Sequence, residues 1–173
     1  MAEPYPVKLF MGILYSDEEK LSQARKRLEA LYGEPDYLSE AFPFTVTDYY
    51  EKEMGRGIYR LFLSFRPLIS PKEIVEVKLE TERIERELAI NDKRRVNIDP
   101  GYMDYNKVIL VSKKYNGQKI YLNSGIYADL TLYYERGSFH PYPWSFPDFK
   151  SGQYNRIFLR IRELYKAGRK RPH

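Results

Sequence analysis

Four short runs in the front half of the chain have the pattern of β-strands. Residues 7–15 (VKLFMGILY) are almost continuously apolar, as in a central strand that is covered on at least one face. Residues 44–50 (FTVTDYY) and 58–65 (IYRLFLSF) are rich in β-branched and aromatic side chains, and the glycine-containing turn between them predicts a hairpin. Residues 95–99 alternate apolar with polar side chains, and the Pro-Gly pair that follows predicts that this strand ends after Asp99.

Two helices are predicted between these strands. Ser16 and Glu19 have the spacing of a capping box, and leucine and alanine then recur at helical spacing until Gly33. Ser70, followed by proline and by Glu73, begins the second helix. The resulting order, βαββαβ, is that of a ferredoxin-like sheet with both helices on one face. Many unrelated functions use this fold, so the fold alone predicts no activity.

The back half adds a hairpin, a loop and a last helix. An Asn-Gly turn places a strand at 119–123, and a Ser-Gly turn leads into another at 126–135. Residues 139–149 (FHPYPWSFPDF) hold three prolines and several aromatic side chains, which predicts an irregular loop packed on the core. An amphipathic helix follows from Ser151. Residues 105–114 fit either a short helix or a strand.

Together these elements predict one α+β domain over residues 1–165: a ferredoxin-like front half extended by a C-terminal β-hairpin, the aromatic loop and a helix. A basic C-terminal tail follows at 166–173. Its Lys166, Arg169, Lys170 and Arg171 supply four of the five net positive charges of the chain. Such a tail is usually a solvated chain end, and the alternative is a weak contact with a polyanion.

Composition excludes several classes of protein. A chain with 43% hydrophobic and 31% charged residues is typical of soluble globular proteins, and no apolar run approaches the roughly 20 residues of a membrane span. We therefore expect a cytoplasmic protein without a signal peptide. Cysteine is absent and there are only 2 histidines, which excludes disulfides, thiolate metal sites and His-rich metal sites. No P-loop, Rossmann glycine motif or nucleophile elbow occurs.

Several polar residues lie where a fold alone does not require them. Asp48 interrupts a strand pattern, so it either faces solvent on an edge strand or points into a polar site. Lys78 flanks the buried stripe of the second helix, where it either extends to solvent or holds a phosphate or carboxylate partner. Asp99, at a strand end, caps a turn or presents an acid to a cleft. His140, in the aromatic loop, is a packing residue or a proton-transfer group.

Asp129 shares one face of its predicted strand with tyrosines. Alternation places Ile126, Ala128, Leu130 and Leu132 on one face and Tyr127, Asp129, Thr131 and Tyr133 on the other. This second face is either solvated or the polar wall of a cleft. In a cleft, tyrosines beside a carboxylate would hold a base or a sugar by stacking and hydrogen bonding.

These residues make up the candidate site. The catalytic candidates are Asp99, Asp129 and His140. The ligand-binding candidates are Asp48, Lys78, Asn97, Asp99, Tyr102, Lys107, Asp129 and Trp144. The carboxylates of Asp48, Asp99 and Asp129 are also the candidate ligands of a divalent cation, because magnesium and calcium prefer oxygen ligands.

Five segments carry a resemblance to a known family. They are PVKLFMGILYSDEE, FPFTVTDYYEKEMG, RRVNIDPGYMDYNKVILVSKK, IYLNSGIYADLTLYY and PWSFPDF, in this order. Through them the chain, from Pro6 to about Tyr165, resembles the uncharacterised prokaryotic family of domains of unknown function DUF4416. The resemblance implies a stand-alone soluble prokaryotic domain and brings no activity with it. Its motif positions include Asp48, Asn97, Asp99, Tyr102, Asp129 and Trp144. Some relatives carry a GTP-binding label, which no P-loop in this sequence supports.

Three functions are compatible with the sequence. The preferred one is binding, or acid–base or metal-assisted processing, of a small phosphorylated or nucleotide-like ligand in a cleft roofed by the aromatic loop. The second is an RNA- or polyanion-binding module, with tyrosine faces for stacking and the basic tail for phosphates. The third is a protein-interaction subunit without a ligand, whose exposed aromatic side chains form the partner surface.

Overall fold

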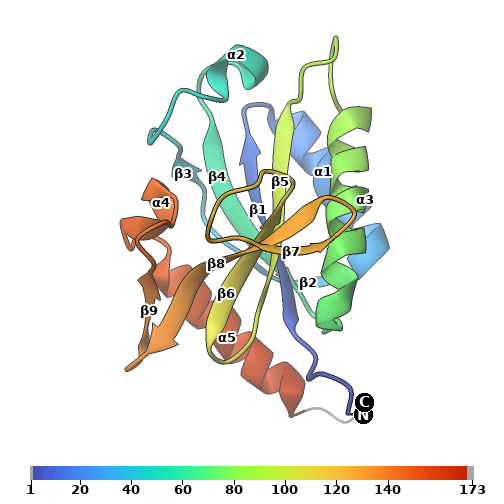
Figure 1. Ribbon diagram of the computed structural model, residues 1–173. Coiled ribbons are helices and arrows are strands. Elements are labelled where there is room, and N and C mark those ends of the chain that lie inside the picture. Colours follow the sequence, from blue (N-terminus) through green and yellow to red (C-terminus); the bar gives the residue numbers. More distant parts are fainter. Residues whose placement is uncertain (1, 171–173) are drawn as a thin grey trace.

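One antiparallel sheet with helices on both faces makes up the protein over residues 2–170, which the computed structural model describes (Figure 1). The strands are β1 (Lys8–Tyr15), β2 (Pro35–Leu38), β3 (Phe42–Pro43), β4 (Tyr59–Phe65), β5 (Val96–Met103), β6 (Lys107–Ser112), β7 (Ile120–Asn123), β8 (Ile126–Glu135) and β9 (Ser138–Pro141). The helices are α1 (Glu18–Tyr32), α2 (Glu51–Met54), the 3-10 turn η1 (Pro71–Glu73), α3 (Ile74–Glu87), α4 (Pro147–Lys150) and α5 (Asn155–Arg169). The predicted α+β class is confirmed.

The sheet runs through the whole molecule. Its strands follow the order β2-β4-β1-β5-β6-β8-β7, with β3 beside β4 and β9 beside β8. All of these neighbours are antiparallel. The strands of the front half therefore belong to one larger sheet that the back half continues, and the ferredoxin-like arrangement stays a prediction.

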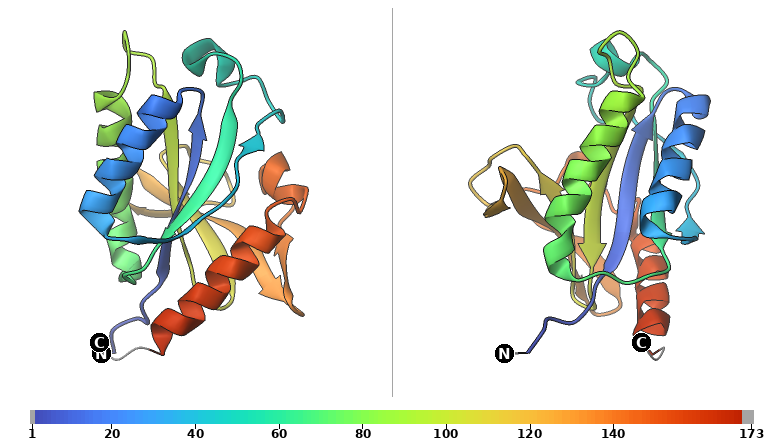
Figure 2. Two further views of the ribbon diagram at one scale, coloured as in Figure 1. Left: turned by 180° about the vertical axis from the view of Figure 1, so that it is seen from behind. Right: turned by 90° about the vertical axis from the view of Figure 1, so that its right-hand side faces the viewer.

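The two faces of the sheet have separate cores. Leu9, Met11 and Ile13 of β1 pack with α1 and α3, and this side is called the α1/α3 face. Phe10, between them in sequence, points the other way and contacts Phe158 of α5, on what is called the α5 face. Figure 2 shows α1 and α3 together on one side of the sheet and α5 crossing the other side. Because both faces are covered, β1 is apolar along its whole length, as its sequence predicts.

The prediction that residues 44–50 and 58–65 pair as a hairpin is wrong. β4 pairs instead with β2 and β3, and residues 44–50 form the irregular connection that leads into α2. The aromatic side chains of Phe44 and Tyr50, which suggested a strand, pack on Met54 in a small cluster of their own. Aromatic content in this segment therefore reports local packing rather than strand pairing.

The prediction that the strand of residues 95–99 ends after Asp99 is also wrong. β5 continues through Pro100 and Gly101, but β6 pairs only with its last three residues. The N–H of Ile98 points to this open side of β5, and the nitrogen of Pro100, two residues later, points the same way. The proline therefore removes no hydrogen bond between strands. After Pro100, β5 and β6 approach each other closely: a Cβ on Gly101 would lie only 2.3 Å from the carbonyl oxygen of Ile109.

A bulge in β8 changes the predicted faces of that strand. Leu130 and Leu132 pair with consecutive residues of β6, so Thr131 is an extra residue and the alternation reverses there. Ile126 consequently packs on the α1/α3 face and Leu132 on the α5 face, although alternation predicted one shared face. Asp129 precedes the bulge and thus lies on the same face as Leu132.

Residues 105–114, whose sequence fits either a short helix or a strand, contain the strand β6. The two strands predicted after it are present as β7 and β8. The aromatic loop is more regular than predicted: its start forms β9 along the end of β8, and its end forms α4. The last helix begins at Asn155 rather than at Ser151. Within residues 2–170, no helix has both the length and the apolar character that a membrane crossing needs.

Candidate functional site

A buried arginine joins several elements on the α5 face. Arg60 comes from β4 and is only 5% exposed. Its side chain crosses β1 at Gly12, where a Cβ would lie 3.2 Å from its Nη1. Nη1 donates a hydrogen bond to Oδ2 of Asp99 on β5 at 2.9 Å, and Nε lies 3.8 Å from Oδ2 of Asp148 in α4. One cation thus contacts carboxylates from two other elements, and it passes close to the glycine of β1.

From Asp99 a chain of hydrogen bonds continues towards α2. Asn97 donates from Nδ2 to Oδ2 of Asp99 at 3.0 Å, and its Oδ1 accepts from Arg94 at 2.8 Å. Arg94 in turn holds both carboxylate oxygens of Glu53, at 2.7 and 2.8 Å. Asp99 keeps 29% of its side-chain surface exposed, so solvent and solutes reach this carboxylate in spite of its partners.

Residues of α3 lie against the open side of β5. Glu85 accepts the backbone N–H of Ile98 at 2.6 Å and so takes the place of the missing neighbour strand. Lys78 lies two turns earlier on the same helix face and is 9% exposed. Its ammonium group makes no hydrogen bond, and no ion pair within 4.0 Å, to any residue from 2 to 170. The Lys78 side chain is therefore largely buried while its ammonium group still reaches solvent, and the donors of that group are not used by residues 2–170.

The pKa values of the two nearest carboxyl groups are shifted in opposite directions. Burial raises the pKa of Glu85 to about 7, and the charges of Lys78 and Arg94 offset only part of this effect. Burial also acts to raise the pKa of Asp99, but the charges of Arg60 and Lys78 and the hydrogen bonds to the carboxylate outweigh it and hold the pKa below its usual value. A carboxyl group that exchanges its proton near neutral pH, beside one that stays ionised, suits acid–base chemistry.

Three of the predicted site residues, Lys78, Asn97 and Asp99, thus belong to one group of side chains. Asp129 lies on the α5 face, as Asp99 does, but on β8, with β6 between its strand and β5. Its Oδ1 is buried and has no hydrogen-bond partner within residues 2–170. Burial raises the pKa of Asp129, against the charge of Lys119.

The other predicted site residues lie elsewhere. Asp48 is exposed and lines a small groove of about 250 Å³ next to α2. Tyr102 packs on the α1/α3 face, and Lys107 pairs with a neighbouring aspartate at the turn between β5 and β6. His140 Nε2 lies 3.0 Å from a backbone oxygen of the β8–β9 hairpin. Trp144 donates from Nε1 to a backbone oxygen of β8 at 2.8 Å, which ties the aromatic segment to the sheet.

The carboxylates predicted as metal ligands do not form one centre. Within residues 2–170 no three histidine, aspartate or glutamate side chains come together in a way that would hold a metal ion. Asp99 is paired with Arg60, whereas Asp48 and Asp129 lie in separate surroundings.

Sequence reasoning missed Arg60, Glu85, Arg94 and Asp148. Two signals were present. Arg60 is the charged residue in an otherwise apolar strand run, and Glu85 repeats the helical spacing of Lys78 on a face that is otherwise buried. Arg94 and Asp148 stand in connecting segments and gain their roles only through the topology.

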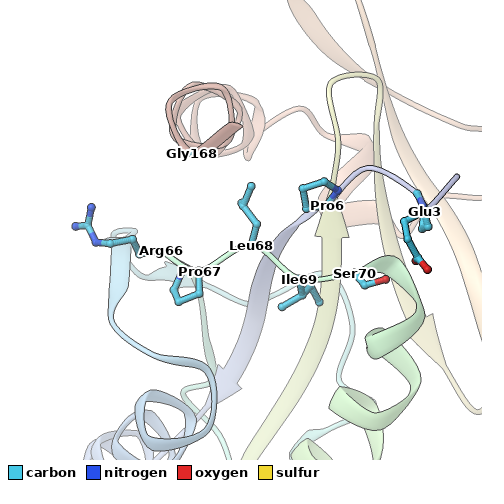
Figure 3. Close-up of a pocket in the computed structure, with 9 residues that line it drawn as sticks. Glu3, Pro6, Arg66, Pro67, Leu68, Ile69, Ser70 and Gly168 are labelled. Atoms are coloured by element: carbon cyan, nitrogen blue, oxygen red, sulfur yellow. The ribbon is translucent and has the colours of Figure 1, made fainter. Parts of the chain in front are cut away.

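A second groove, of about 560 Å³, lies at the opposite end of β1 (Figure 3). It is formed by Glu3, Pro4 and Pro6, the connection 66–70 and Gly168 near the end of α5. Prolines and aliphatic side chains make up most of its wall, and none of the predicted site residues lines it. The polar group around Asp99 is therefore the better candidate site.

Comparison with known families identifies the chain. The model of the family described as "Domain of unknown function (DUF4416)" matches residues 5–165, so the chain belongs to this family. No curated protein and no solved structure matches it. The family assignment confirms the resemblance in the sequence and leaves the function to be inferred from the site.

Proposed function

We propose that this member of the DUF4416 family binds a small anionic ligand, phosphorylated or nucleotide-like, at the open side of β5. We further propose that the carboxyl groups of Asp99 and Glu85 there transfer a proton from or to that ligand. The observation that carries the proposal is Lys78: a cation that is 9% exposed and donates no hydrogen bond within residues 2–170. The stem of this side chain is buried and its ammonium group reaches solvent, so the group is held in place with its donors available to an anion.

The neighbours of Lys78 favour an anion as its missing partner. Asp99 is already paired with Arg60, so its charge is largely neutralised before any ligand enters. Glu85, with a pKa of about 7, is partly uncharged near neutral pH and therefore repels an anion less than an ordinary glutamate would. An entering phosphate or carboxylate would supply the acceptors that Lys78 lacks.

The two carboxyl groups suit different roles. Asp99 is ionised and reachable from solvent, which suits an acceptor for a ligand hydroxyl or N–H group. Protonated Glu85 is a proton donor, and because its pKa is about 7 it can take up a proton again from water at neutral pH. With these assignments the site would need no metal ion.

Thermal unfolding tests this proposal. Wild-type protein is heated with inorganic phosphate, AMP, glucose 6-phosphate or magnesium, together with Lys78→Met, Asp99→Asn and the control Lys72→Met. Lys72 is an exposed lysine just before the same helix. A ligand at 100 times its Kd stabilises by about 2.7 kcal/mol, which raises the Tm of a protein of this size by roughly 5 to 10 °C. We expect a phosphorylated compound to raise the Tm by this amount in the wild type and in Lys72→Met, and we expect the shift to be lost in Lys78→Met. The proposal fails if no phosphorylated compound shifts the wild type, or if Lys78→Met keeps the shift.

A further inference from the structure

The hairpin that links β6 to β8 is basic and aromatic, and it has no acidic residue from 112 to 128. Its charged residues are Lys113, Lys114 and Lys119, and its aromatic residues are Tyr115, Tyr121 and Tyr127. The surface formed by these six residues is called the hairpin patch. In the sequence it is a second concentration of positive charge, apart from the basic tail at 166–173.

The tyrosines of the hairpin patch form one exposed cluster. Tyr115 and Tyr121 are 72% and 56% exposed, and both contact the ring of Tyr127, with centroids 5.6 and 5.3 Å apart. Tyr121 and Tyr127 are cross-strand partners of β7 and β8. The mutual contacts restrict the rings while leaving more than half of the two outer ones in solvent. Such rings lose little conformational freedom when a planar group stacks on them.

The lysines flank these rings and make few contacts. Lys113 pairs with Glu82 of α3 at 2.7 Å and is still 49% exposed. Lys114 donates to the hydroxyl of Tyr49 at 3.1 Å, and Lys119 donates to the backbone oxygen of Lys114 at 3.0 Å. Each ammonium carries three N–H donors, so donors remain for phosphate oxygens. Tyr49, itself 63% exposed, extends the aromatic surface beside Lys114.

The hairpin patch stands at the edge of the sheet. β7 is the last strand in the sheet order, and all four of its residues are exposed. Figure 1 shows β7 and its flanking loops standing in front of the sheet, and the right-hand view of Figure 2 shows them projecting from one side of the molecule. A long flexible ligand can therefore pass along this edge without entering the core.

We propose that the hairpin patch binds single-stranded nucleic acid without sequence preference, the tyrosines stacking on bases and the lysines contacting phosphates. Stacking rings interleaved with basic side chains are the common device for this ligand. A duplex hides its base faces and would use only the lysines. A second copy of the chain paired along β7 would bring two lysine-rich hairpins together, and this repulsion disfavours self-association. The inference does not depend on the Lys78 site.

Fluorescence anisotropy with a labelled thymidine oligonucleotide tests the proposal, using the full chain. We expect Tyr121→Ala and Tyr115→Ala each to weaken binding about fivefold or more, as loss of one stacked base requires. Tyr5→Ala, which removes a 75% exposed ring at a distant position, is the matched control and should bind like the wild type. Affinity should fall with salt, and replacing both Lys113 and Lys114 by glutamine should reduce the slope of log K against log salt by about 1.4.

Several results would overturn the inference. One is absence of binding at low salt. Another is equal affinity for a duplex of the same length. A third is loss of binding when Lys166 and Lys170 are replaced by glutamine while Tyr121→Ala binds normally, since the tail would then be the contact. A fourth is a dimer in sedimentation experiments that Tyr121→Ala dissociates, because the hairpin would then be a subunit interface. Circular dichroism of each variant verifies that the fold is intact.

Discussion

Replacement of Glu85 by glutamine should make the stability of the protein less dependent on pH. The pKa of Glu85 is about 7 in the folded protein, against an ordinary value of 4.5. The folded state therefore binds this proton more tightly than the unfolded chain does. Its contribution to stability is complete below pH 4.5 and is lost as the pH rises through about 7. The difference between these two pKa values corresponds to roughly 3 kcal/mol, most of which disappears between pH 5 and pH 8.

Glutamine keeps the oxygen that accepts the N–H of Ile98 but cannot become charged. Urea unfolding at pH 5 and pH 8 should therefore show Glu85→Gln gaining roughly 2 to 3 kcal/mol relative to the wild type as the pH rises. Glu87→Gln, which removes an exposed charge of the same helix, is the control for general charge effects. If the difference between Glu85→Gln and wild type is the same at both pH values, the buried position of this carboxyl group does not govern its protonation and the reasoning is refuted.

Three further changes test the surroundings of the site. Arg60→Met leaves two carboxylates without their counter-ion and should lower the free energy of unfolding by about 3 to 5 kcal/mol; a loss below about 1 kcal/mol in urea would contradict the bridging role. Gly101→Ala should cost about 3 kcal/mol or more because its Cβ would meet a backbone oxygen at 2.3 Å, whereas Gly117→Ala, with open space around it, should unfold like the wild type. Trp144→Phe removes one hydrogen bond and should cost about 1 kcal/mol, measured by circular dichroism because this is the only tryptophan; an unchanged midpoint would mean that the bond does not hold the segment.

Local patterns in the sequence predicted the elements whose signals are complete within a few residues. The apolar run of β1, the proline-led start of the second helix and the turn between β7 and β8 are of this kind. Even there, the cap of α1 is Asp17 rather than Ser16: the side chain of Asp17 accepts the backbone N–H of Lys20. The hydroxyl of Ser16 bonds instead to the backbone oxygen of Met54 in a distant segment.

Features that depend on distant neighbours were not predictable in this way. Proline usually ends a strand, and Pro100 does not, because no strand pairs with that side of β5 at this point. The bulge at Thr131 is visible only as a shift in pairing with β6. For the candidate site, the sequence predicted Lys78, Asn97 and Asp99. The topology supplied Arg60, which reaches Asp99 from β4 by passing over Gly12 of β1.

Nuclear magnetic resonance of the lysine side chains is the most direct test of the proposed ligand site. The ammonium signal of Lys78 is identified by its loss in Lys78→Met, and AMP and inorganic phosphate are then titrated into wild-type protein. We predict that this signal moves and saturates with the ligand, since the ammonium group exchanges water for the acceptor oxygens of the bound anion. A Lys78 signal that stays in place while those of exposed lysines move, or that no phosphorylated compound moves, would contradict a ligand site at the open side of β5.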